Sequence, residues 1–405
     1  MIRVNVAVKS LGTFALALLC ASAWPCAVFQ PPREYQLPTA HIDFDARPQA
    51  QALIKRSFDD YAKALKHAQS MHRVIETFLR LPTEKNLLRA QQSWRRARRY
   101  YQRTEWMRFV DGPIDWPQAA SQAAGPESRL NAWPLNEAVI DYVAGAPNAG
   151  IINQLDLPLT LNSVLAKNQV GDENDVTTGW HAIEFLLWGQ DFSVSGPGQR
   201  SHTDFIAGDP ARDRRRQYLR IVTQLLVSDL THVSKEWDLQ DPISYGSRLS
   251  KLPSSEIIGP ALHGAASLIA IELHGERFAV PLDSGAQEDE HSCFSDNTLA
   301  DLRDDLAGIT RMLRNSATAE STGDSLYALI EWKNPALAAQ LRVAMHEAER
   351  LMAEVPEPFD QLILQDGASP DRKKAEAALA ALQTLAVKLK ASAETLSLQI
   401  VVPGV

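Results

Sequence analysis

The apolar residues of this chain recur with the spacing of an α-helix almost throughout, and this spacing constrains the fold more than any other feature. From Leu87 to Tyr101 apolar side chains return at steps of three and four residues, which places them on one face of a helix. The alternation that is typical of strands is almost absent. The sequence therefore predicts an all-α protein whose amphipathic helices pack around shared cores.

Turn-forming residues divide the chain into helical stretches. We expect helices over residues 48–81, 84–110, 135–143, 151–170, 179–188, 210–238, 254–279, 298–315, 324–333, 334–355 and 370–399. The stretch 254–279 is rich in glycine and alanine, which lets neighbouring helices approach closely, so it should lie deep in the fold. A basic cluster in the second helix, formed by Arg95, Arg96, Arg98 and Arg99, is interpreted as a solvated face.

Residues 1–23 have the pattern of a secretion signal peptide. Arg3 and Lys9 precede a short apolar run, and Ala21-Ser-Ala23 offers a cleavage site. The run is too short to span a bilayer, and we expect no transmembrane segment after its removal. Residues 24–45 are rich in proline and should form an extended lead-in. The mature chain would lie in the periplasm or cell envelope, where Cys26 and Cys293 could pair.

Two halves of the chain resemble each other weakly. The segment 108–115 is similar to 277–283, and 179–185 is similar to 326–332, so that His181 corresponds to Ala328 and Glu184 to Glu331. We therefore expect two four-helix-bundle-like halves, residues 46–200 with the His/Glu motif and residues 201–405. The net charge of −8 gives no electrostatic support for a nucleic-acid partner.

The helix over 179–188 carries a histidine and a glutamate one turn apart within an apolar run. His181 and Glu184 share one face of the helix, with Asp191 further along it. Such a pair can hold a cation, share a proton or form a structural hydrogen bond. Phe185 stands where the inverted zinc-peptidase motif has its second histidine, so a zinc peptidase of a familiar helix type is not supported.

Carboxylates elsewhere in the chain could complete a cation site with this pair, because carboxylates that converge with a histidine inside a bundle suit a hard or borderline cation. The candidate metal ligands are His181, Glu184, Glu105, Asp115 and Glu137. Arg108 and Arg277 could hold these acids in place, with Glu276 and Asp191 as further supporting residues. Each arginine could equally form a structural ion pair.

The motifs together resemble the imelysin family, in its iron-regulated-protein and insulin-cleaving-protease-like branch. Gly179 to Glu184 is similar to the family's G-x-H-x-x-E signature, and its continuation to Asp191 also matches. Further similar blocks are 108–115, 131–137 and 287–298, and the resemblance covers roughly residues 45–400. Position 299 is leucine where this branch leads us to expect histidine.

The resemblance implies an envelope protein with two helical halves, a functional cleft near their junction, an association with iron uptake and a contested peptidase label. We expect a protein that binds a metal ion, iron or else zinc, or a metal complex, with other envelope iron-uptake components as partners. In the alternative, a metallopeptidase, Glu184 would activate a metal-bound water. A third interpretation is a haem receptor that stacks its ligand on Trp133, Trp180 and Trp188.

Overall fold

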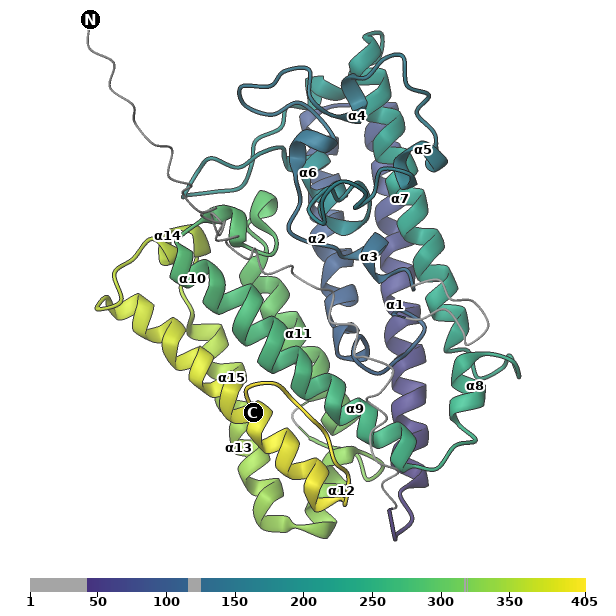
Figure 1. Cartoon of the computed structure of the whole chain (residues 1–405), viewed down its shortest axis with the longest axis vertical. Coiled ribbons are helices and arrows are strands. Elements are labelled where there is room, and N and C mark those ends of the chain that lie inside the picture. Colours follow the sequence, from purple (N-terminus) through teal and green to yellow (C-terminus); the bar gives the residue numbers. More distant parts are fainter. Residues whose placement is uncertain (1–41, 116–124, 317, 319) are drawn as a thin grey trace, which may run out of the picture. The chain divides into compact units, whose positions relative to one another are not determined.

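The computed structural model describes residues 42–115, 125–316, 318 and 320–405 (Figure 1). The α-helices are α1 (Arg47–Arg80), α2 (Glu84–Gln102), α3 (Glu127–Leu130), α4 (Gly150–Asn153), α5 (Leu161–Leu165), α6 (Gly179–Trp188), α7 (Pro210–Glu236), α8 (Tyr245–Leu249), α9 (Ser255–Ser267), α10 (Val280–Ser284), α11 (Thr298–Arg314), α12 (Leu326–Lys333), α13 (Pro335–Glu354), α14 (Phe359–Ile363) and α15 (Pro370–Thr395). The residues described contain no strand, so the all-α prediction is confirmed. The predicted signal peptide lies outside them, as do Cys26 and most of the lead-in.

Short helical turns connect these helices. Five of them are 3₁₀ turns, η1 (Glu105–Met107), η2 (Glu137–Val139), η3 (His202–Phe205), η5 (Gln287–Asp289) and η6 (Cys293–Ser295). The predicted helix over 135–143 is reduced to η2. The remaining segment, η4 (Leu268–Ala279), is a π-helix that continues α9 and runs on into α10.

The helices pack as two groups of four. In the first, α1 lies along α2 and α7, and α6 packs against α2 and α7 (Figure 1). In the second, α15 packs against α13, α9 and η4, while α11 packs against α13 and η4. The boundary predicted at residue 200 separates α6 from α7, two helices that pack together. α7 also packs along α1, and α11 packs against α2.

The long helix formed by α9, η4 and α10 joins the two groups, because α9 also packs against α1 and η1. The sequence predicted no transmembrane segment, but by length and composition alone the helix Ser255–Ser284 could cross a membrane. Of its most apolar 18-residue stretch, 67% is buried within the structure. The prediction that this stretch lies deep in the fold is confirmed, since Ile258, Leu262, Ala265 and Ile269 are buried.

Replacing Gly264 on α9 with alanine is expected to lower the free energy of unfolding by about 1–3 kcal/mol, the usual range for overpacking. An added Cβ would lie 2.4 Å from the Trp106 carbonyl oxygen and 2.9 Å from Val110 Cγ1. Gly259 on the same helix is the matched control, because its Cβ would meet only Leu398 at 3.8 Å. Gly259→Ala should be neutral or stabilising by up to about 1 kcal/mol. Urea unfolding of both variants tests the difference in sign.

Candidate metal centre

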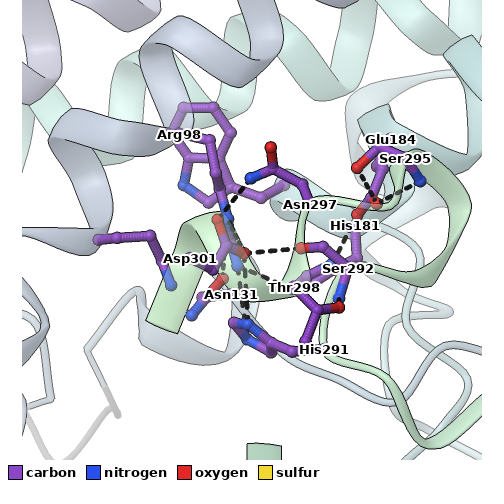
Figure 2. A network of polar contacts seen from close by, with 12 residues as sticks. Arg98, Asn131, His181, Glu184, His291, Ser292, Ser295, Asn297, Thr298 and Asp301 are labelled. Carbon is purple, nitrogen blue, oxygen red and sulfur yellow. Dashed lines mark hydrogen bonds and ion pairs between the residues drawn. The ribbon is translucent and has the colours of Figure 1, made fainter. Parts of the chain in front are cut away.

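The guanidinium of Arg98 lies at the centre of a fully buried polar network (Figure 2). Its Nε donates to Asp301 Oδ2 at 3.0 Å, and its Nη1 donates to Asn131 Oδ1. Its Nη2 lies 3.2 Å from His181 Nε2 and 3.4 Å from His291 Nε2. A guanidinium has donors only, so both imidazole nitrogens must be acceptors. Four acceptors thus surround one buried positive charge.

The position of Arg98 on α2 explains its burial. It follows Trp94 by four residues and precedes Tyr101 by three, so it belongs to the apolar stripe. Its guanidinium lies 5.8 Å from the ring centroids of both aromatic residues. The interpretation of the basic cluster as a solvated face was wrong for Arg98. The neighbouring Arg95, Arg96 and Arg99 are exposed, as expected.

His181 and Glu184 come from α6 and are both buried. His181 Nδ1 lies 2.9 Å from Glu184 Oε2. Because Nε2 accepts from Arg98, Nδ1 carries the proton and donates to Glu184. Glu184 Oε1 accepts from the Ser295 backbone N–H at 3.0 Å and from Ser295 Oγ at 2.6 Å. Both oxygens of Glu184 are therefore occupied, and the glutamate fixes the orientation of the imidazole.

Burial controls the ionisation of the two histidines. It lowers the pKa of His181 well below its usual value, and the charge of Arg98 lowers it further. Burial likewise lowers the pKa of His291, with Arg277 and Arg98 adding to the effect. Burial raises the pKa of Glu184 to about 8, although the hydrogen bonds from Ser295 oppose this rise. Both imidazoles are neutral near pH 7, which is the form that binds metals.

His291 is positioned by the segment 287–298 and by α11. Its Nδ1 lies 3.4 Å from Asp301 Oδ2 on α11. Asp301 also accepts from Ser292 Oγ at 2.7 Å and from Asn297 Nδ2 at 2.7 Å, so three neighbours fix its carboxylate. Leu299, at the position where histidine was expected, is a buried core residue.

A second buried arginine extends the network through Asn131. Asn131 Nδ2 donates to Glu105 Oε2 at 3.2 Å. The same oxygen lies 3.0 Å from Arg277 Nη2. Arg277, on the π-helix η4, also donates to Asp305 Oδ2 at 3.0 Å and to Glu272 Oε2 at 3.1 Å. The predicted ligand Glu105 and the predicted supporting residue Arg277 are therefore joined to the His181 pair in one network.

Arg108 lies beside this second cluster and shares two of its acids, Glu105 and Glu272, with Arg277. Its Nη1 lies 3.7 Å from Glu272 and 4.0 Å from Glu105, and its Nη2 lies 3.4 Å from Glu127. Burial raises the pKa of Asp115 despite the nearby charge of Arg108. The connected region holds more carboxylates than arginines. Its acids are Glu105, Asp115, Glu127, Glu184, Glu272, Asp301 and Asp305, and its arginines are Arg98, Arg108 and Arg277.

Three residues of the predicted set lie elsewhere. Glu137, on η2, is half-buried near Gln190, and burial raises its pKa. Glu276 is exposed on η4. Asp191 belongs to a separate group of acids with Asp296 and Asp360. Arg98, Asn131 and Asp301 were not assigned to the site from the sequence. Arg98 carried a signal in its place on the apolar stripe, and Asn131 carried one in its place in the block 131–137.

The tryptophans considered as a stacking surface have different environments. Trp180 and Trp188 are buried and pack edge-to-face against Trp94, with ring centroids 6.2 and 5.4 Å apart. Trp133 is partly buried. Its indole N–H donates to the Glu290 carbonyl at 2.9 Å, and its ring lies edge-on to His291. Two of the three are therefore core residues.

Fold and site define an all-α protein of two packed four-helix groups with a buried histidine, arginine and carboxylate network. The family model described as Imelysin matches residues 57–389, and the chain belongs to the imelysin family. It is 25% identical over 334 residues to iron-regulated protein A of Synechococcus elongatus, covering 78% of this chain and 80% of that protein.

Two solved structures share the fold. One, from Parabacteroides distasonis, is described as an iron-regulated protein A precursor; it has a TM-score of 0.67 and 17% identity, over 89% of this chain and 98% of that chain. An imelysin-like protein from Psychrobacter arcticum has a TM-score of 0.61 and 14% identity, over 89% of this chain and 99% of that chain. At these identities the likeness is one of fold.

Proposed function

We propose that this protein binds a metal ion, iron or else zinc, between His181 and His291, as an iron-related binding protein of the cell envelope. The observation that supports this most is that two neutral imidazoles direct their Nε2 atoms at one point, the Nη2 atom of Arg98. That point is already a cation position, because a guanidinium nitrogen fills it. Imidazole nitrogens suit iron and zinc.

The surroundings of each imidazole fit this role. Metal-binding histidines commonly donate their other N–H to a carboxylate, which fixes the ring and raises its basicity. Glu184 accepts from Nδ1 of His181, and Asp301 lies beside Nδ1 of His291. Asp301 and Asn131, which now accept from Arg98, are the oxygen ligands available to a cation in its place. The carboxylates around Arg277 outnumber the arginines, and this excess of negative charge further favours the binding of a cation.

Arg98 and a metal ion would exclude each other. Metal–nitrogen bonds to histidine are about 2.0–2.1 Å long, whereas the imidazole nitrogens now lie 3.2 and 3.4 Å from the Arg98 nitrogen. Loading therefore requires the guanidinium to withdraw and the two rings to approach each other. We infer that Arg98 occupies the site in the metal-free protein and limits its affinity.

The association with iron rests on the family and on the name of the relative from Synechococcus elongatus. A location in the periplasm or cell envelope, and partners among other iron-uptake components, rest on the signal-like segment 1–23. Hydrolysis gains no support from the geometry, because both oxygens of Glu184 are occupied by His181 and Ser295. A general base would need an oxygen that faces the reacting water.

Titration of chelator-stripped protein with Fe²⁺ and Zn²⁺, followed by calorimetry, tests the proposal. His181→Ala and His291→Ala should each abolish saturable uptake, whereas His346→Ala, at an exposed position, should leave it unchanged. Arg98→Met should tighten binding by about tenfold or more, because it removes a competing charge. Circular dichroism would confirm that each variant is folded. Uptake that survives both histidine substitutions would refute the proposal.

A further inference from the structure

A second group of acids lies apart from the Arg98 network. One carboxylate oxygen from each of Asp191, Asp296 and Asp360 lies within 4.8 Å of the others. The three come from separate parts of the chain: the segment after α6, the residue after η6 and the first turn of α14. The fold therefore brings together charges that repel each other, which calls for a compensating partner.

A buried glutamate adds an independent observation. Glu290 is fully buried, its carboxyl group pairs with that of Asp360 and lies near Thr298, but neither of its oxygens has a donor in good hydrogen-bond geometry. Asp360 is 1% exposed and lies near Gln287, and neither of its oxygens has a donor in good hydrogen-bond geometry. Asp191 Oδ2 and Asp296 Oδ1 are also buried without a well-placed donor. The four acids together hold six buried oxygens that have no well-placed donor, although buried polar groups are rarely left unsatisfied.

No side chain neutralises these acids. Within the part of the chain that the structure describes, none of the four forms an ion pair with lysine, arginine or histidine. The positive charge of Arg95 favours the ionised form of Asp296, but its guanidinium donates its hydrogen bond to the Ser295 carbonyl instead. Burial raises the pKa of Glu290 to about 10 and that of Asp296 to about 8. One proton shared between Glu290 and Asp360 and another shared between Asp191 and Asp296 would satisfy at most four of the six oxygens.

We propose that Asp191, Asp296, Asp360 and Glu290 form a binding site for a hard divalent cation, Ca²⁺ above all. Calcium takes about six to eight oxygen ligands at about 2.3–2.6 Å, so two ligands on opposite sides of the ion lie about 4.8 Å apart. The aspartate oxygens lie within that distance of one another. Mg²⁺ prefers about 2.0–2.1 Å and a stricter octahedron. A purely oxygen donor set differs from the imidazole pair at His181, and the two sites should prefer different metals.

The test uses the full mature chain stripped with a chelator and titrated with CaCl₂ by calorimetry. We expect saturable binding with a Kd of about 10⁻³ M or tighter, the range of calcium modules in extracellular proteins. At a hundredfold excess over Kd, the melting temperature should rise by about 3 °C. The ion would tie together three chain segments that otherwise repel, so it binds the folded state only.

Asp360→Asn is the decisive variant. It keeps the shape of the side chain and removes one repelling charge, so the metal-free variant should melt no lower than the wild-type protein. Its calcium-dependent rise in melting temperature should be lost. Glu288→Gln, at an exposed acid on the same loop as Glu290, should keep the full response. His181→Ala should also keep it, which separates this site from the one proposed for iron.

Two outcomes would overturn the inference. Wild-type protein that shows neither heat of binding nor a shift in melting temperature up to about 10 mM Ca²⁺ would mean that the acids share protons instead. A response that is unchanged in Asp360→Asn would place calcium elsewhere on this acidic protein. Loss of the response in Asp360→Asn alone, with Glu288→Gln and His181→Ala unaffected, is the result that the geometry requires.

Discussion

Replacing Arg277 with methionine is expected to lower the free energy of unfolding by about 3–5 kcal/mol, the cost of breaking a buried ion pair from one side. The guanidinium is 2% exposed and lies 3.0 Å from oxygens of Glu105, Glu272 and Asp305. Methionine fills a similar volume but leaves these carboxylates without their main partner. Chemical denaturation at pH 7 measures the loss.

Arg350 provides the matched control. It also pairs with two carboxylates, Glu347 and Glu354, each at 2.7 Å, but all three side chains are about half exposed. Exposed ion pairs contribute little to stability because water and salt screen them, so Arg350→Met should be close to neutral. If the two substitutions had equal effects, burial would not decide how much these ion pairs contribute to the free energy of unfolding. The carboxylates around Arg277 would then not depend on its charge.

Replacing Asp141 with asparagine should destabilise the fold by a similar amount, about 3–5 kcal/mol. Asp141 is fully buried and lies 2.9 Å from Arg200 Nη1 and 2.6 Å from Arg215 Nε. The amide keeps the shape but removes the carboxylate that pairs with Arg215, and it leaves Arg200 with Asp204, 3.3 Å from its Nη1. Asp283→Asn, at a side chain that is 82% exposed, is the control and should change stability by less than about 0.5 kcal/mol.

The effect at Asp141 should depend on pH with a defined sign. Burial favours the neutral acid, but the hydrogen bonds and charges of Arg215 and Arg200 outweigh it and lower the pKa. A carboxyl group with a lowered pKa contributes stability above its unfolded pKa and loses it as pH falls through its folded value. The gap between wild type and Asp141→Asn should be constant from about pH 5 to 8 and narrow below about pH 4. A gap that widened on acidification would contradict this.

Much of the fold follows from the sequence because helical periodicity is a local signal. The stripe from Leu87 to Tyr101 predicts α2, and glycine and alanine content predicts a deeply buried α9. The position of α7 could not be predicted from helical periodicity, because the periodicity shows which face of a helix is buried but not which neighbouring helix covers that face. Its packing along α1 is a long-range property of the whole chain.

The site was only partly predictable for the same reason. His181 and Glu184 are three residues apart, so their contact is local and was foreseeable. The partners that define their chemistry come from far along the chain: Arg98 precedes His181 by 83 residues, and Ser295 follows Glu184 by 111. Arg98 was predicted to be exposed because arginine side chains are seldom fully buried, even beside apolar residues of a helix. Its place at the centre of a buried polar network was therefore not predicted.

Ser295 and Asp296 are adjacent in the chain, yet Ser295 holds Glu184 while Asp296 faces Asp191 and Asp360. A single peptide unit thus separates the imidazole pair from the cluster of acids. A ligand that binds at one of these two sites and moves the peptide unit also changes the positions of the side chains at the other site. The effect of each ligand on the binding free energy of the other is then equal in both directions. Under the two proposals above, calcium bound by the acids would change the concentration of iron or zinc at which the imidazole pair becomes loaded.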